Sequence, residues 1–440
     1  MTRTYRSVAL AALVLVVAGT SGVVTGTGPA ASAEASGRPV AAAGSVGATV
    51  DVVSTYGRVD PLMQATPSQW GGAFVDDSGR LVVRYVGQSR SAAAAALARV
   101  GVPQTAVDLR AGTVSLTTLQ RQQTRLSGLA RTSGQLTSVG PDYAAGRLRV
   151  EGAGSASRLT SDVTRLLGGD GPAPVVTARP ATPLPAAKTS SRYYDTGSLH
   201  GGGLINLTGN AGGYQYTSHC STGFSWIGRD GAAYGLTAGH CFLEPGAPAM
   251  GTVSVRTSGS TTRVVGTVAA TTVTKGTNVK GRRGDLAVFK LNRRPGQPVS
   301  ALTSGRIYTG LGNSTTTRAV RGSVLLPQGY SSAAIRTSGS SGYQVSRRLG
   351  EISPTRITAV DRTITWPDGQ QFTGITIAAD RTEHTSAGDS GGAVYLKNAN
   401  GTAAAVGIMS GYAYDPLSKS YWNYYTPLKY VPVAGRLKNG

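Results

Sequence analysis

Short apolar segments separated by glycine- and proline-containing turns run through the second half of the chain. Residues 286–289 and 403–408 are almost wholly apolar, and residues 372–377 alternate between larger apolar and small or polar side chains. Regularly spaced short strands of this kind predict an antiparallel sandwich or barrel. The tail at residues 427–437 is expected to form one closing helix.

The first half of the chain mixes helical and strand patterns, which predicts a small α+β fold. A turn at Asp77–Gly79 separates two apolar strands, and Asp142–Val150 repeats the same order of acid, turn, Gly-Arg-Leu and strand. This part of the chain has neither His nor Cys, and we find no chemistry in it. The predicted elements are strands at residues 70–75, 81–83 and 175–177 and helices at residues 91–100, 117–129 and 157–167.

The first 33 residues have the order of charged, apolar and small residues that is typical of a secretory signal peptide. Arg3 and Arg6 precede the apolar run at residues 8–17, and Ala31–Ala33 supplies a cleavage site. A membrane-spanning helix needs about 20 apolar residues, and no segment of the chain reaches that length. We therefore expect a secreted, extracellular protein without a transmembrane anchor.

Proline and small residues dominate the stretch that follows the α+β fold, which predicts an exposed linker with a cleavage zone. The chain therefore divides into a signal peptide at residues 1–33, a front region at 34–170, the linker at 171–200 and a back region at 201–440.

Composition narrows the class of protein. Of the 440 residues, 40% are hydrophobic and 15% are charged, which allows a folded core and excludes wholesale disorder. The 61 glycines have no collagen-like period. They also make a helical bundle unfavourable, because each glycine inside a helix costs about 1 kcal/mol.

The net charge of +22 suggests anionic partners such as nucleic acids. However, the basic residues occur singly or in pairs, and no nucleic-acid-binding motif is present. We expect a solvated basic surface without a specific nucleic acid partner. Adsorption to an anionic cell wall is the alternative role for this charge.

The two cysteines, Cys220 and Cys241, are expected to form a disulfide because the protein is exported. Such a bridge contributes about 3 kcal/mol to stability in the chain-entropy account. His219 and His240 lie beside the cysteines, so a Cys–His metal site is the alternative, which export disfavours. We expect neither a metal nor a cofactor.

Two short motifs carry the candidate chemistry. His240 lies in Leu236–Cys241, where small residues leave room for a general base at the end of a strand. Ser390 lies in the sequence Gly-Asp-Ser-Gly-Gly, whose glycines let amide N–H groups converge on the anion formed at an attacked carbonyl. Of the other histidines, His200 and His219 are expected in surface or loop roles.

The order of these residues along the chain limits the kind of hydrolase. The nucleophile elbow of α/β-hydrolases needs a His after the Ser, and no His follows Ser390. The subtilisin order needs an Asp before the His, together with helices that this region lacks, so the order His, Asp, Ser remains. We choose Asp285 as the acid because it opens the strongly apolar segment 286–289. The other acids in the interval are Glu244, Glu351, Asp361, Asp368, Asp380, Glu383 and Asp389.

The segments Thr237–Cys241, Gly284–Ala287 and Gly388–Gly392 resemble the three catalytic segments of chymotrypsin-fold serine peptidases. The Ala-Gly-His-Cys form and the preceding region resemble the secreted bacterial branch that includes α-lytic protease and the streptogrisins. The resemblance covers about residues 204–437 and implies two six-stranded antiparallel β-barrels with the active site between them. It also implies a secreted endopeptidase that acts on proteins or peptides and is made as a proenzyme. The front region would then be a pro-region that assists folding and inhibits the enzyme until cleavage between about residues 187 and 203.

Carried over residue by residue, the resemblance implies that Ser390 is the nucleophile, His240 the general base and acid, and Asp285 the residue that orients the imidazole. The N–H groups of Gly388 and Ser390 would form the oxyanion hole, and Cys220–Cys241 would match the disulfide beside the catalytic His. The segment Ser410-Gly411-Tyr412 resembles the strand that pairs with the substrate backbone, and Ser410 is also expected to hydrogen-bond Asp285. The remaining candidates for substrate binding are Met409 and His384.

The sequence leaves two questions undecided, namely which substrate side chain is preferred and whether the protein is a peptidase. Met409 favours a small or medium apolar side chain in the substrate, whereas His384 favours an acidic or aromatic one. Two other functions fit the same residues, namely an esterase or other acyl hydrolase and a binding protein on a peptidase fold that attaches to anionic surfaces.

Overall fold

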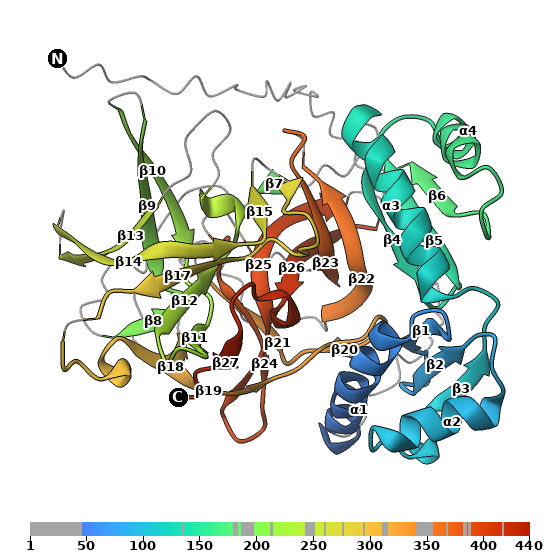
Figure 1. Ribbon diagram of the computed structural model, residues 1–440, viewed down its shortest axis with the longest axis horizontal. Helices are drawn as coiled ribbons and strands as arrows, with labels where there is room; N and C mark the ends of the chain where they lie inside the picture. Colours follow the sequence, from blue (N-terminus) through green and yellow to red (C-terminus); the bar gives the residue numbers. More distant parts are fainter. Residues whose placement is uncertain are drawn as a thin grey trace, which may run out of the picture. The chain divides into compact units, whose positions relative to one another are not determined.

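The chain divides into two compact units, Met1–Ala42 and Ala43–Gly440. The computed structural model describes residues 46–133, 136–178, 184–185, 198–211, 214–242, 251–258, 261–274, 277–293, 295–309, 316–339, 355–366, 368–381, 385, 389–415 and 418–440 (Figure 1). The first unit lies outside these residues, so the signal peptide at residues 1–33 stays a prediction. Among the described residues, no helix combines the length and apolar character that a membrane span needs.

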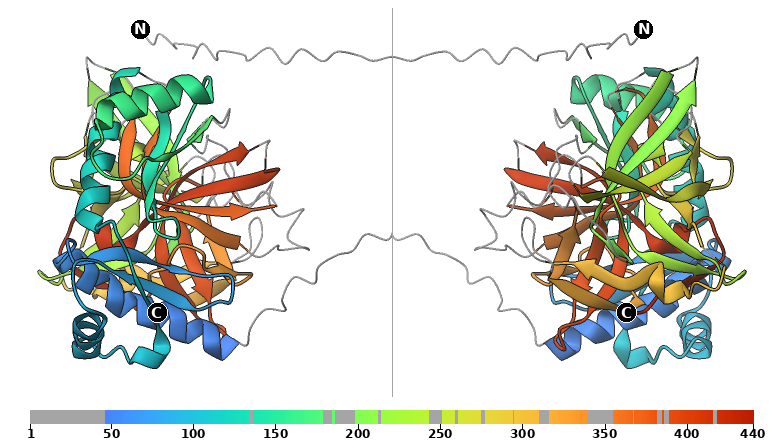
Figure 2. Two further views of the ribbon diagram at one scale, coloured as in Figure 1. Left: turned by 90° about the vertical axis from the view of Figure 1, so that its right-hand side faces the viewer. Right: turned by 90° about the vertical axis from the view of Figure 1, so that its left-hand side faces the viewer.

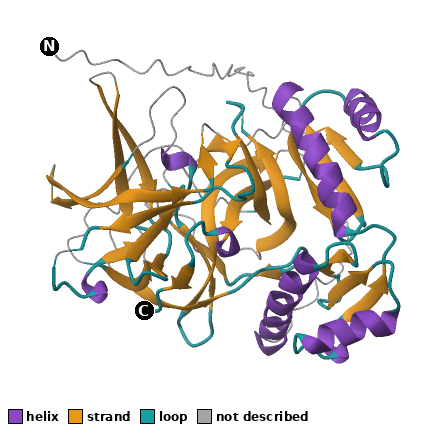
Figure 3. Ribbon diagram, viewed as in Figure 1, coloured by secondary structure: helices purple, strands orange, loops and turns teal. Residues whose placement is uncertain are grey.

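The helices of the described residues gather in the front region, whereas the back region is almost entirely strand and loop (Figure 3). Strands β1 Trp70–Val75, β2 Leu81–Tyr85 and β3 Asp108–Ala111 form one three-stranded sheet. The three predicted helices are confirmed as α2 Arg90–Arg99, α3 Leu116–Ser133 and α4 Ala156–Leu167. The Ser89 side chain caps α2 by accepting a hydrogen bond from the Ala92 N–H, which accounts for its start.

A further helix, α1 Val46–Ala65, was not predicted. Glycines, β-branched residues and Pro61 give this segment a weak local preference for helix. Its buried side chains Val53, Tyr56, Val59 and Met63 recur every three or four residues. That spacing is the signal that could have identified it, because it places one face of the helix against the core.

Strands of the front region continue the sheet of the back region. β4 Leu136–Asp142 pairs with β5 Arg147–Gly152, which pairs in parallel with β6 Val175–Ala178. On its other side β4 pairs antiparallel with β22 Thr355–Thr365, Val139 facing Thr363 and Ser138 facing Ile364.

Two antiparallel barrels form the back region, as predicted. Within the described residues, the sheet of the first barrel has the order β10-β9-β13-β14-β17-β12-β11-β27 (Figure 1). Its core contains Ile205, Leu207, Val253 and Phe289, all fully buried. The strands are β9 Leu204–Ala211, β10 Tyr214–Ser221, β11 Ser225–Gly228, β12 Ala233–Thr237, β13 Thr252–Ser258, β14 Thr261–Thr271, β17 Ala287–Leu291 and β27 Gly435–Leu437.

The second barrel has the strand order β22-β23-β26-β25-β24-β21. The short strand β20, which precedes β21 in the sequence, pairs with β22 and so connects the last strand of this order to the first. Strands β25 and β26, red in Figure 2, form a long hairpin. The strands are β20 Ser331–Ser332, β21 Ile335–Ser338, β23 Gln371–Asp380, β24 Ala393–Lys397, β25 Ala403–Asp415 and β26 Ser420–Pro427. The remaining short elements are β7 Leu184–Pro185, β8 Leu199–Gly201, β15 Val273–Thr274, β16 Thr277–Asn278, β18 Thr303–Tyr308 and β19 Thr317–Ser323, and the 3₁₀ turns η1 Gln104–Ala106, η2 His240–Phe242, η3 Val299–Ala301 and η5 Leu428–Tyr430.

The predicted closing helix at residues 427–437 is wrong. The segment forms only the 3₁₀ turn η5, and the chain then pairs as β27 with β11. Pro432 has no N–H to donate within a helix and Gly435 disfavours one, so a helix cannot continue past the first turn.

Candidate active site

The ends of two neighbouring strands bring His240 and Asp285 together. β12 and β17 pair with Thr237 opposite Ala287, and the chain reaches His240 directly after β12 and Asp285 directly before β17. Ser390 lies shortly before β24 of the second barrel. Its carbonyl oxygen accepts a hydrogen bond at 2.7 Å from the N–H of Ser221, which lies on β10 of the first barrel. The site therefore lies where the two barrels meet.

The three side chains form a continuous hydrogen-bonded row. His240 Nε2 lies 3.0 Å from Ser390 Oγ, and His240 Nδ1 lies 2.6 Å from Asp285 Oδ2. The main-chain N–H of His240 also donates to Asp285 Oδ1 at 2.7 Å. Asp285 and Ser390 are buried, and 14% of the His240 side chain is exposed.

The surroundings of His240 favour its protonated form. Burial disfavours the imidazolium and by itself would lower the pKa of His240. The Asp285 carboxylate acts against burial through its charge and its hydrogen bond, with a contribution from the charge of Asp368, and the pKa of His240 is raised above its ordinary value. When neutral, a ring with a raised pKa is a stronger base, so it can accept a proton from Ser390 and hold it.

Glycines allow the close approach of the segments at this site. A Cβ on Gly239 would collide with Val273, and one on Gly391, whose φ is +86°, would collide with Thr237 Oγ1. Gly239, which precedes His240, therefore has a packing role, and Gly391, which follows Ser390, has a packing role as well as a conformational one.

A second row of hydroxyls supports Asp285 from behind. The Asp285 N–H donates to Thr426 Oγ1 at 2.8 Å, and Thr426 Oγ1 lies 3.4 Å from Ser410 Oγ. Ser410 was expected to bind Asp285 itself, but the described residues connect the two through Thr426. Sequence reasoning missed Thr426, because nothing near it marks a residue 141 positions from Asp285 as its neighbour.

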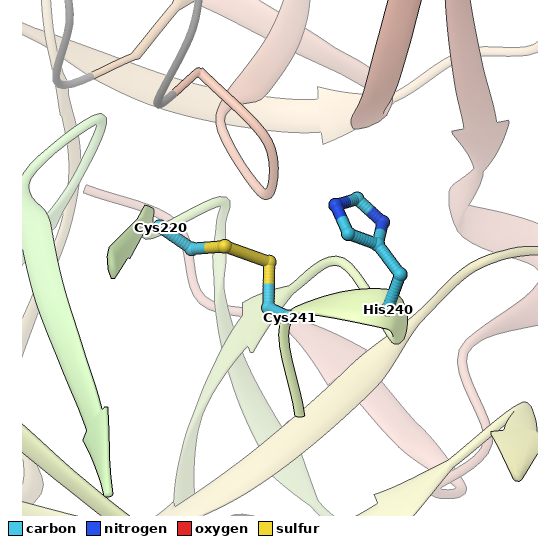
Figure 4. A group of neighbouring side chains, drawn as sticks. All are labelled: Cys220, His240 and Cys241. Carbon is cyan, nitrogen blue, oxygen red and sulfur yellow. A yellow bond between two sulfur atoms is a disulfide. The ribbon is translucent and has the colours of Figure 1, made fainter. Parts of the chain in front are cut away.

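A disulfide joins Cys220 and Cys241, as predicted. Figure 4 shows both side chains beside His240, with the two sulfur atoms bonded to each other. In this form the cysteines are not thiolates, so they do not combine with His240 as metal ligands. The bridge instead ties β10 to the turn that carries His240.

The candidate substrate segment Ser410–Tyr412 belongs to β25 and follows the part of that strand that pairs with β24. Ser390 Oγ is 3.4 Å from the Ser410 carbonyl oxygen. Beyond Ser410, the side of β25 that faces away from β26 pairs with β7 of the linker, Gly411 facing Pro185 and Tyr412 facing Leu184. Met409, a candidate pocket residue, has no exposed surface and belongs to the core.

The two histidines that were expected in surface or loop roles both lie away from Ser390. His200 stacks on Tyr308 with ring centroids 5.0 Å apart, and His219 Nδ1 lies 2.6 Å from Asn206 Oδ1 on the neighbouring strand. Both lie in strands, neither in a loop, and neither takes part in the hydrogen-bonded row around Ser390. His384 and Gly388 lie outside the described residues.

The Trypsin family model matches residues 208–434, slightly more than half of the chain. Among solved structures, a Nocardiopsis protease (NAPase) is 22% identical, with a TM-score of 0.33, and the match covers 52% of this chain and 93% of that one. Protease Anisep from Arthrobacter nicotinovorans is 15% identical, with a TM-score of 0.25, 55% of this chain and 93% of that one being covered. No curated protein matched the chain.

Proposed function

Because the chain belongs to the trypsin family, we propose that it is a secreted serine endopeptidase that is made as a proenzyme. The observation that carries this proposal is the row Ser390–His240–Asp285, with separations of 3.0 and 2.6 Å. A nucleophile, a base and an orienting acid in this arrangement perform acyl transfer.

In the proposed acylation step, Ser390 Oγ attacks the carbonyl carbon of the scissile peptide bond while its proton moves to His240 Nε2. Asp285 holds the Nδ1–H of the ring and stabilises the imidazolium that forms. Collapse of the tetrahedral intermediate breaks the C–N bond, and His240 gives its proton to the departing amine. A water molecule then repeats the same steps on the acyl-enzyme, with His240 first as base and then as acid, and releases Ser390.

The oxyanion of both tetrahedral intermediates would be bound by the N–H groups of Gly388 and Ser390. The glycines around Ser390 support this role, because they permit the close, converging backbone that such a site needs. The protein fold, the glycine-rich turn and the three side chains together supply what acyl transfer requires.

We further propose that the substrate backbone pairs with Gly411 and Tyr412. The pairing of β7 with these two residues supports this, because it is an extended chain bound antiparallel on the same edge. Met409 and His384 remain our candidates for contributing to specificity, Met409 from the core behind that edge.

Residues 34–170 are proposed to be the pro-region, released by cleavage between about residues 187 and 203. Its contacts with the back region are extensive and complementary. The Val75 N–H donates to the Gln328 carbonyl at 2.7 Å, and the Tyr143 N–H donates to Gln328 Oε1 at 3.0 Å. Three ion pairs have the acid in the front region and the base in the back region, namely Asp60–Lys429, Asp77–Arg356 and Glu151–Arg362.

The test is the intact mass of the secreted protein before and after a fluorophosphonate probe, with Ser390→Ala alongside. We expect a wild-type fragment that begins between residues 187 and 203 and gains one adduct, and a mutant that gains none. Loss of Ser390 should lower casein hydrolysis by about 10⁴-fold or more, as loss of the nucleophile does in triad enzymes. A folded, processed wild type that takes up no probe would overturn the proposal, and hydrolysis of short esters without casein would replace it by an esterase.

A further inference from the structure

The edge of β25 that carries Gly411 and Tyr412 continues to Asp415. β26 pairs along one side of this stretch, with Tyr414 opposite Tyr421 and Asp415 opposite Ser420. On the other side, no strand among the described residues pairs with Ala413 or Tyr414. An extended peptide can therefore add to this edge beyond Tyr412.

Two tyrosines lie side by side on one face of the neighbouring strands β25 and β26. Tyr414 is 47% exposed, and its ring centroid lies 5.0 Å from that of Tyr421. Because side chains alternate along a strand, Tyr412 and Tyr414 share a face, while the intervening Ala413 is buried on the other. The rings thus form an aromatic surface continuous with Tyr412.

The turn behind these tyrosines is held by its own hydrogen bonds. The Ser418 hydroxyl donates to Asp415 Oδ2 and lies 2.6 Å from Ser420 Oγ. Asp415 is fully buried. A ligand that binds the two rings therefore meets a surface that is already ordered, which reduces the entropic cost of binding.

The register of β7 defines which substrate residue reaches the tyrosines. Gly411 faces Pro185 and Tyr412 faces Leu184, so a chain followed toward its N-terminus moves toward Asp415. Two residues further in the same register, a side chain lies opposite Tyr414 and on its face. That side chain, Tyr414 and Tyr421 would form a cross-strand row of three.

We propose that Tyr414 and Tyr421 form a substrate subsite for an aromatic or large apolar side chain. This side chain belongs to the substrate residue two positions N-terminal to the one that pairs with Tyr412. The proposal rests on the proposed peptidase function and adds a specificity determinant to it. Aromatic pairs contribute binding free energy beyond that of the area that they bury. For this subsite we expect the contribution to raise kcat/KM about fivefold.

The test uses internally quenched peptides based on the sequence of the linker. A short peptide begins at the residue equivalent to Leu184 and ends at that of Arg192. Two longer peptides add X-Pro before it, where X is Phe or Gly and falls opposite Tyr414. Wild type is compared with Tyr414→Ala, with Tyr414→Ala/Tyr421→Ala and with Tyr414→Phe, which keeps the ring. The control is Val264→Ala, since Val264 on β14 is 52% exposed and lies in the other barrel.

We expect wild type, Tyr414→Phe and Val264→Ala to cleave the Phe peptide with about fivefold higher kcat/KM than the Gly peptide. In the double variant this ratio should approach one, with the short peptide cleaved as by wild type. Peptides that are not cleaved are measured as competitors of casein hydrolysis, where the same ratio is expected in the inhibition constants. A Phe preference that is absent in wild type, or unchanged in the double variant, would overturn the subsite. Failure of wild type to hydrolyse casein and every peptide would instead overturn the peptidase function itself.

Discussion

Both carboxylate oxygens of Asp285 bind His240. Oδ2 lies 2.6 Å from ring Nδ1, and Oδ1 accepts the main-chain N–H of the same residue at 2.7 Å. The acid therefore fixes the backbone of His240 and the rotation of its ring together. Its own N–H is bound by Thr426, so the carboxylate has little freedom to leave this position.

Replacing Asp285 by Asn should leave a folded protein with a wrongly oriented proton. The Asn amide donates toward Nδ1, which moves the ring proton to Nε2, where it faces Ser390 and prevents base catalysis. We expect kcat to fall by about 10⁴-fold with little change in the thermal melting temperature. Steady-state kinetics and a melting curve on the same preparation check this, and kcat within tenfold of wild type would assign the orienting role to another acid.

The raised pKa of His240 predicts a loss of activity on the acid side. The ring must be neutral to accept the proton of Ser390, so activity falls as the pH drops through its pKa, above the ordinary value of about 6.5. Stability responds in the opposite direction, since the protonated ring stabilises the fold below about pH 6.5 and this contribution disappears as the pH rises through the raised pKa. In Asp285→Asn the acid limb of log kcat/KM should move to lower pH. A limb at the same pH in both proteins would show that another group controls it.

The Cys220–Cys241 disulfide joins two residues 21 positions apart and closes a loop that ends next to His240. Converting both cysteines to alanine should lower the free energy of unfolding by about 3 kcal/mol, because the unfolded chain regains the entropy of an open loop. Denaturant unfolding of this variant, of wild type and of wild type with a reductant provides the comparison. Equal midpoints for all three would argue that the bridge contributes nothing measurable.

Local signals predicted most elements of the fold, since alternation, turn glycines and caps act within a few residues. The strand at residues 70–75 and the helix at 157–167 match the observed β1 and α4 within a residue. The segments around His240 and Ser390 carry their own glycines, so their local form was also accessible. The contacts that bring distant segments together could not be predicted from such local signals. Thr426 behind Asp285 and β4 beside β22 depend on pairings between residues more than a hundred positions apart. The failed helix at residues 427–437 has a local cause instead, because Pro432 and Gly435 stop a helix after its first turn, and the chain then pairs with β11.

Among the described residues, Arg362 is the most deeply buried charged residue at the contact between the front and back regions. Its guanidinium is 1% exposed and donates to Ser138 Oγ at 2.9 Å and to the Gly140 carbonyl at 3.0 Å. Glu151, 5% exposed, lies 3.6 Å away. Burial lowers the pKa of Arg362, and the charge of Glu151 opposes this effect. Glu151 therefore supplies the opposite charge for the Arg362 guanidinium, which has almost no access to water.

Glu151→Gln should weaken this contact more than a change at an exposed pair. Arg362 keeps its other acceptors but loses the charge of Glu151, which we expect to lower the free energy of unfolding by about 3 kcal/mol or more. The matched control is Asp77→Asn, because Asp77 is 100% exposed and lies 3.7 Å from Arg356, so about 0.5 kcal/mol or less is expected. Both are made in the full chain together with Ser390→Ala, and intact mass selects the preparations in which the front region is still attached. Denaturant unfolding gives the free energies, and hydrogen exchange at residues 136–142 and 355–365 reports the opening of β4 from β22. Faster exchange in Glu151→Gln alone is the expected result. Equal effects of the two substitutions would mean that burial adds nothing to this ion pair.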